Sequence, residues 1–141
     1  MATVPIAGVD KPVSLTCDIG VPSLGGVTPL AAGSGNVANA SAAATLTGTA
    51  TTTVYITGFE VTGAGATAAN VVTVTVAGLL GGTRSYTYTF PAGATVACQP
   101  LIVSFYPALP ASAVNTAIVV TCPASGSGGT NNTVVVHGFY V

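Results

Sequence analysis

Short runs in which apolar residues alternate with Thr or Ser recur along this chain of 141 residues. In residues 71–77 Val72, Val74 and Val76 alternate with Thr73 and Thr75, and in residues 84–90 Tyr86, Tyr88 and Phe90 alternate with Ser and Thr. A period of two residues is typical of a strand with one buried face, and no segment repeats with the 3.6-residue period of an amphipathic helix. The pattern therefore predicts an all-β protein.

Turn residues divide the rest of the chain into further strands. Residues 42–49 and 51–62 are expected to form one strand pair or one bent strand, in which Gly58 marks a bulge or a close approach of two backbones. Pro107 and Pro110 are expected to bracket a loop, because proline has no N–H for a central ladder. The expected strands are 42–49, 51–62, 71–77, 84–90, 95–106, 117–122 and 133–141.

The expected fold is a two-sheet antiparallel sandwich with about eight strands. The connections at residues 63–70 and 107–115 are longer than a tight hairpin, which favours a jelly roll over a simple meander. At this length a chain buries about two thirds of its unfolded surface, so one domain is enough. We assign this sandwich to residues 36–141.

The first 35 residues have a different texture. They contain four of the nine prolines and only one short strand-like run, residues 13–19. Such a segment suits an extended arm better than a packed layer. We therefore expect residues 1–35 to form an N-terminal arm that lies along a neighbouring subunit.

Charge is nearly absent from the sequence. It has two basic and three acidic residues, where a soluble domain of this length has roughly 35 charged residues. Hydroxyl and amide groups or a neighbouring subunit must therefore cover the surface, which indicates a part in a large assembly. We expect the protein itself to be a homodimer, or alternatively a homotrimer. Two basic side chains are too few to form the positive surface that binds nucleic acid, so no nucleic-acid partner is expected. The charged residues are Lys11, Arg84, Asp10, Asp18 and Glu60.

The uncharged stretch from Ile19 to Phe59 raises the question of a membrane segment. Proline, glycine, Thr and Asn interrupt it, and it holds no run of about 20 mostly apolar residues. The first residues lack the basic and apolar regions of a secretory signal. We expect a soluble protein made in the cytoplasm, with no membrane partner.

Few side chains here could support catalysis. His137 lies in an expected strand and is interpreted as a surface or hydrogen-bonded histidine, and Glu60 has no second carboxylate nearby in sequence, as glycoside hydrolysis would need. Residues 63–67 are rich in glycine, but no Walker lysine and no helix follow them. We expect no enzyme and no cofactor. The sequons at Asn39 and Asn131 are interpreted as chance matches.

The three cysteines, Cys17, Cys98 and Cys122, are widely spaced. We interpret them as small buried apolar residues. A Cys98–Cys122 disulfide is the alternative, although a reducing compartment disfavours it. A zinc site formed with His137 lacks any paired ligand spacing, so no metal is expected.

Tyrosines offer one binding hypothesis. Tyr86 and Tyr88, joined by Tyr55 from a neighbouring strand, would form an aromatic strip that stacks on sugar rings. The competing interpretation is that they fill the core or a subunit interface, where tyrosine supplies a large area with a polar tip.

Four segments within residues 51–141 share an overall texture, and they are Val54–Gly63, Pro100–Phe105, Pro110–Ala124 and His137–Phe139. In this texture residues 51–141 resemble the small head-decoration, or cement, proteins of tailed bacteriophages. The resemblance implies a jelly roll that forms a homo-oligomer on the outer surface of an icosahedral head, has the major capsid protein as its partner and bridges neighbouring capsid subunits. It implies no catalytic residues. The alternative function is a head-fibre or carbohydrate-binding adhesion module with exposed tyrosines.

Overall fold

Nine β-strands make up the part of the protein that its computed structural model describes, residues 27–126 and 130–141. Their sequences are rich in Val, Thr and Ala, and β-branched residues such as Val and Thr suit a pleated surface. The strands are β1 (Thr28–Gly33), β2 (Val37–Ala38), β3 (Ala42–Leu46), β4 (Val54–Ala64), β5 (Asn70–Ala77), β6 (Arg84–Phe90), β7 (Leu101–Pro110), β8 (Ile118–Cys122) and β9 (Asn131–Tyr140).

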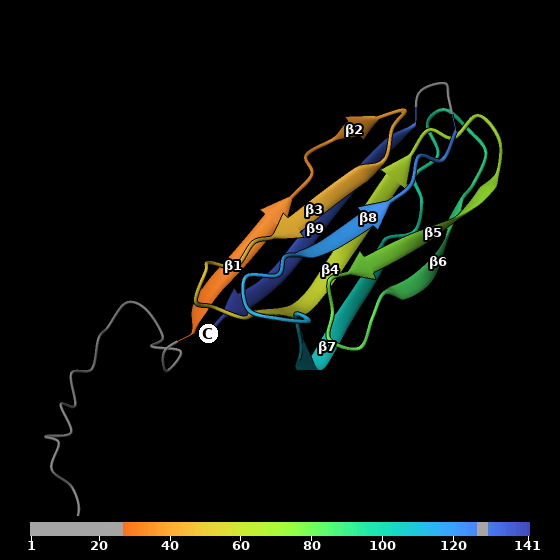
Figure 1. Cartoon of the computed structure of the whole chain (residues 1–141). Coiled ribbons are helices and arrows are strands. Elements are labelled where there is room, and N and C mark those ends of the chain that lie inside the picture. The colour runs from red at the N-terminus through yellow and green to blue at the C-terminus, as the bar shows by residue number, and fades with distance from the viewer. Residues whose placement is uncertain (1–26, 127–129) are drawn as a thin grey trace, which may run out of the picture.

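The strands form two antiparallel sheets that pack face to face (Figure 1). Sheet A has the order β1-β9-β4-β7, and the short β2 also pairs with β9. Sheet B has the order β3-β8-β5-β6. Most connections cross from one sheet to the other, and β5–β6 is the one hairpin that joins two long strands consecutive in the chain. This arrangement is a jelly roll, as the sequence predicts.

The core lies between the sheets and is made of alternate residues of each strand. In β5, Val72, Val74 and Val76 are buried, whereas Val71 and Thr73 are exposed. This confirms the period of two that the sequence shows. The largest fully buried side chains are Phe59, Phe90, Leu46, Ile56, Ile118, Val54, Val61, Val74, Val76, Val120, Val134 and Val136.

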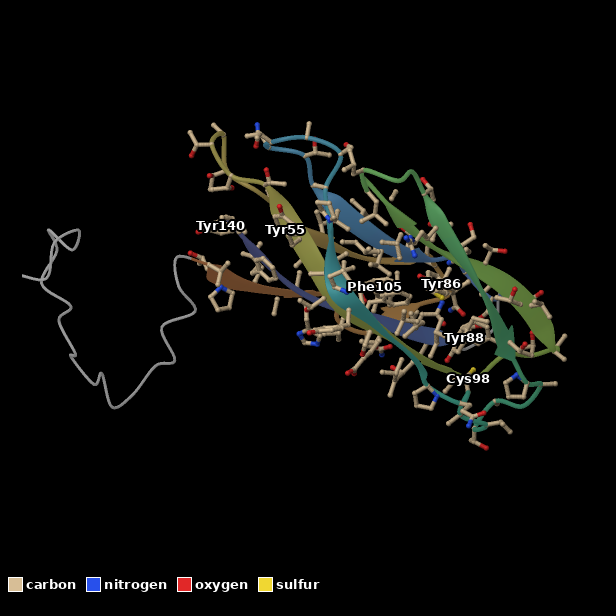
Figure 2. All side chains as sticks on the ribbon, turned by 90° about the horizontal axis from the view of Figure 1, so that it is seen from below. Tyr55, Tyr86, Tyr88, Cys98, Phe105 and Tyr140 are labelled. Atoms are coloured by element: carbon tan, nitrogen blue, oxygen red, sulfur yellow. The ribbon has the colours of Figure 1, made fainter. Side chains whose placement is uncertain are left out.

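The two long sides of the sandwich differ. On one side β1 of sheet A packs against β3 of sheet B, which closes the core. On the other side β6 and β7 are the edge strands, and no comparable packing joins them. Figure 2, which views the sandwich from below, shows Phe105 and Tyr86 between these two strands. Leu101, Val103 and Phe105 of β7 are therefore only partly buried.

Gly58 lies at an irregularity of sheet A. The pairing of β4 with both β7 and β9 shifts between Ile56 and Gly58. A Cβ atom added to Gly58 would lie 2.6 Å from the carbonyl oxygen of Val103. The bulge and the close backbone approach expected at this glycine are both confirmed.

The boundary expected at residue 35 is wrong for residues 28–33. These residues form β1, and each of them pairs with a residue of β9, from Thr28 opposite Tyr140 to Gly33 opposite Val135. Pro29 is tolerated because β1 is an edge strand. Residues 1–26, which include the strand-like run 13–19, lie outside the described residues.

Two other expectations about strands are wrong. Residues 42–49 and 51–62 form neither a strand pair nor one bent strand, because β3 belongs to sheet B and β4 to sheet A. A tight turn, in which the amide N of Thr52 donates to Thr49 O at 3.2 Å, carries the chain between the sheets. Pro107 and Pro110 lie in β7 rather than around a loop. An edge strand accepts proline because one of its sides needs no ladder.

Candidate functional site

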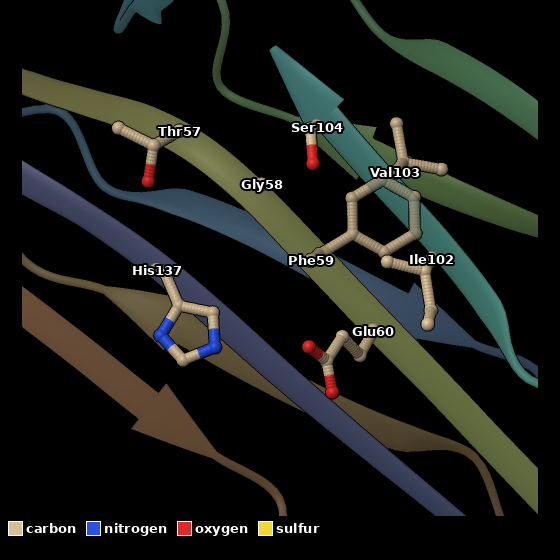
Figure 3. Close-up of a pocket in the computed structure, with 8 residues that line it drawn as sticks. All are labelled: Thr57, Gly58, Phe59, Glu60, Ile102, Val103, Ser104 and His137. Atoms are coloured by element: carbon tan, nitrogen blue, oxygen red, sulfur yellow. The ribbon is translucent and has the colours of Figure 1, made fainter.

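The outer face of sheet A carries a hollow of about 160 Å³ over β4, β7 and β9 (Figure 3). Gly58 pairs with Ser104 on one side and with His137 on the other, and it has no side chain to fill the space between them. The bulge in β4 thus creates the hollow. Its lining residues are Thr57, Gly58, Phe59, Glu60, Ile102, Val103, Ser104 and His137.

Glu60 and His137 share this hollow, although no sequence pattern predicts that they lie together. Glu60 lies two residues beyond Gly58 on β4, and His137 lies opposite Gly58 on β9. Both side chains are exposed, as expected for a surface histidine. Figure 3 shows the carboxylate and the imidazole on the same side of the sheet.

The chemistry that this hollow can support is limited. Glu60 is the one carboxylate among its lining residues, whereas glycoside hydrolysis uses two. The volume of the hollow is smaller than that of typical pockets for organic ligands, which is roughly 300 Å³ or more. The described residues hold no group of three His, Cys, Asp or Glu side chains that could bind a metal ion. The hollow is a polar depression within a larger surface.

Two large side chains of β7 are exposed: Ile102 pairs with Glu60 on the outer face of sheet A, and Tyr106, four residues further along, follows the same alternation. Tyr106 is 102% exposed and Ile102 is 65% exposed. Residues 105–108 bulge opposite Thr57, because Gly58 pairs with Ser104 while Ile56 pairs with Leu109. Tyr106 was not predicted as a surface residue. The alternation of Leu101, Val103 and Phe105 with the residues between them was the signal that would have placed it outward.

A cross-strand row of rings lies beside the hollow. Tyr55 pairs with Phe139 on one side and with Pro110 on the other, and Phe139 also pairs with Pro29. The rings of Tyr55 and Phe139 stack with centroids 5.1 Å apart. The outer face of sheet A therefore combines an aromatic and proline row, a polar hollow and the exposed Tyr106.

The aromatic strip expected from Tyr86, Tyr88 and Tyr55 does not exist. Tyr86 and Tyr88 belong to β6 of sheet B and point into the sandwich, whereas Tyr55 lies on the outer face of sheet A. Tyr88 is 5% exposed, and the Tyr86 ring packs edge-on against Phe59 at 5.3 Å. The competing interpretation, that these two residues fill the core, is confirmed.

Cys98 and Cys122 are both buried and free, so the disulfide considered from the sequence is absent. Burial raises the pKa of Cys122 to about 11 and also raises the pKa of Cys98. The pKa of Tyr88 is raised as well, chiefly by burial. These groups stay protonated near neutral pH, which fits the prediction of small buried apolar residues. Cys17 lies outside the described residues.

The described part of the chain carries two charged side chains, Glu60 on β4 and Arg84 at the start of β6. Lys11, Asp10 and Asp18 lie outside it. The glycine-rich residues 63–67 close β4 and lead into strand β5, not into a helix. The two sequon asparagines are engaged within the domain, because Asn39 Oδ1 accepts from the Thr130 amide and Asn131 Oδ1 accepts from Asn36.

Comparisons with models of known protein families, with curated proteins and with solved structures find no match. Within residues 27–126 and 130–141, no helical segment combines the length and the apolarity needed to cross a bilayer.

Proposed function

We propose that the protein is a structural component of a phage virion, which binds the outer surface of the icosahedral head and stabilises it by bridging neighbouring capsid subunits. Its partners are the major capsid protein and further copies of itself. It is made in the host cytoplasm and resides on the assembled head. The proposal starts from the resemblance of residues 51–141 to phage cement proteins, and the jelly roll is compatible with it.

The strongest support for the proposal is that exposed aromatic and apolar side chains lie on a face almost without charge. Tyr106 and Ile102 stand free on β7, and the outer face of sheet A has Glu60 as its charged side chain among the described residues. The fully buried centre of an interface is depleted in charge and enriched in aromatic residues. This face suits a permanent contact with another protein.

The scarcity of paired reactive groups in the hollow supports the same assignment. Glu60, His137, Thr57 and Ser104 can exchange hydrogen bonds with a partner at the rim of such a contact. A decoration protein needs affinity and shape rather than a reactive group. We accordingly propose that it is not an enzyme.

Sedimentation with empty heads tests this function. Purified protein is mixed with heads that lack it, and the pelleted fraction is measured against concentration. We expect saturable binding with a fixed number of copies per head. Tyr106→Ala should weaken binding roughly 30-fold, because a tyrosine at the centre of an interface contributes about 2 kcal/mol or more. Val71→Ala, at an exposed position on the outer face of sheet B, should bind like the wild type.

Two results would contradict the proposal. Absence of binding at any concentration would remove the capsid as a partner, and equal weakening by both variants would mean that the outer face of sheet A is not the contact.

A head-fibre or carbohydrate-binding module is the second candidate. It no longer rests on Tyr86 and Tyr88, which face the core. The observation that favours it is the exposed Tyr106, two residues beyond Ser104 of the polar hollow. An aromatic ring beside hydrogen-bonding groups suits a sugar. Glycan binding that Tyr106→Ala abolishes, without binding to heads, would select this function.

A further inference from the structure

The four edge strands of the sandwich differ in how well they are protected. An edge strand exposes unpaired N–H and C=O groups, and proteins normally block it with proline, a bulge, short length, charge or a covering element. β1 contains Pro29 and packs against β3, which has only five residues. β7 contains two prolines and a bulge. Three of the four edges are therefore protected.

β6 lacks these protections. Its seven residues pair with β5 without a register shift, from Arg84 opposite Val76 to Phe90 opposite Asn70. It contains no proline, and Arg84 at its first position is its one charge. On its free side, the described residues leave a hollow of about 250 Å³ between residues 87–89 and residues 99–101, which lead into β7. Figure 1 shows β6 at the margin of sheet B.

We propose that β6 is the self-association surface, and that two copies pair their β6 strands antiparallel about a twofold axis at Thr87. The two four-stranded sheets would join into one sheet through main-chain hydrogen bonds. This inference rests on the self-association proposed above and not on capsid binding. A twofold contact of this kind closes on itself and yields a dimer.

The sequence of β6 is complementary to itself in this register. Thr87 meets its own copy and Ser85 meets Thr89, and both pairs lie on the outer face where these residues are exposed. On the inner face Tyr86 meets Tyr88. Cross-strand pairs of hydroxyl residues and of aromatic residues each favour sheet pairing. The two Arg84 side chains fall at opposite ends, each opposite Phe90, so that no like charges meet.

A partner of other chemistry is less well matched. With one charge at its end, β6 offers no electrostatic pattern that would select an acidic or basic strand. Tyr86 is only partly buried at this edge, and the opposing strand of a second copy would cover the rest of its ring. We therefore assign the occupant of this edge as a second copy of the chain.

Charge pairs at residue 87 test the inference without any capsid. Molar mass is measured by analytical ultracentrifugation across concentration for the wild type, Thr87→Lys, Thr87→Glu and an equimolar mixture of the two variants. We expect a wild-type dimer and a dissociation constant raised at least about tenfold in each variant, because like charges directly opposite each other destabilise a pair. The mixture should restore the dimer, since Lys then faces Glu.

Thr73→Lys is the matched control. Thr73 is also exposed on the outer face of sheet B and pairs with Thr87, but β5 is an inner strand. This variant should remain a dimer. Amide hydrogen exchange of the wild type is an independent measurement that needs no variant. The β6 amides on its free side should lose protection when the protein is diluted below its dissociation constant, whereas those bonded to β5 should keep it.

Several outcomes would overturn the inference. A wild-type monomer at about 1 mM, a trimer, a dimer that Thr87→Lys leaves intact, or a mixture that fails to reassociate would each exclude the twofold β6 contact. Capsid binding by a monomeric wild type would leave the proposed function standing while this contact failed.

Discussion

The rings of Tyr55 and Phe139 lie parallel across β4 and β9, with centroids 5.1 Å apart and planes inclined by 8°. They join the central pair of strands in sheet A on its outer face. We expect Tyr55→Ala and Phe139→Ala to lower the free energy of unfolding, with a coupling of about 0.5 to 1.5 kcal/mol in the double-mutant cycle. Urea denaturation of the four proteins measures it. Additive effects of the two changes would mean that the stack contributes nothing beyond its buried area.

Gly58 should tolerate no side chain. Gly58→Ala places a Cβ atom 2.6 Å from the carbonyl oxygen of Val103, so that the backbones of β4 and β7 must separate. We expect a loss of about 1 to 3 kcal/mol in the free energy of unfolding. Gly81→Ala is the control, because no atom lies within 4 Å of its added Cβ. Equal stabilities of the two variants would contradict the close approach.

We expect the fold to survive removal of residues 1–26 but not of residues 1–35. Deleting residues 1–26 leaves all nine strands in place, whereas deleting residues 1–35 also removes β1 and exposes the edge of β9. We expect cooperative thermal unfolding for the shorter deletion and loss of it, or a large drop in midpoint, for the longer one. Circular dichroism melts compare them. A stable protein after the longer deletion would restore a boundary near residue 35.

Stability should fall in alkaline solution. Burial raises the pKa of Cys122 from 9.0 to about 11, so between these values the unfolded chain has lost a proton that the folded protein keeps. The contribution is fully present below pH 9 and declines as pH rises toward 11. Urea denaturation from pH 8 to pH 10.5 should show a smaller decline for Cys122→Ala than for the wild type. Parallel declines would show that this thiol does not contribute.

Head binding should be nearly indifferent to salt. The described domain carries only Glu60 and Arg84 as charged side chains, so few contacts can be screened when salt rises from about 50 mM to about 1 M. Apolar association should instead weaken on cooling. Head occupancy measured under these conditions separates the two behaviours. Extensive release at high salt would assign the binding to charge.

The sequence predicted the strands and the fold class because alternation is a local signal. Val72, Val74 and Val76 reveal the buried face of β5 with no knowledge of its neighbours. Pairing is not local, and this is why β3 and β4 were expected together although they lie in different sheets. The predictions that Pro29 lies in an arm and Pro107 beside a loop were wrong for the same reason. Proline excludes a central strand, and only the topology shows that β1 and β7 lie at edges.

The candidate surface could be predicted only in part. Glu60 and His137 were recognised as isolated groups. They share a hollow because of the bulge at Gly58 and the pairing of β4 with β9. The two residues are 77 positions apart in the sequence, so no local pattern could predict this. Tyr86 and Tyr88 were correctly placed on one face of a strand. Which face was buried depended on the position of Phe59 in the other sheet.

The position of β9 at the centre of sheet A has a consequence for synthesis. β9 pairs with β1, β2 and β4, yet it is the last of the nine strands to be translated. During translation, β1 and β2 have no partner until the ribosome has released residues 131–140. The emerging chain must keep these uncharged segments apart from those of neighbouring nascent chains. Expression at high ribosome density should therefore favour aggregation before folding, and slower initiation should increase the soluble yield.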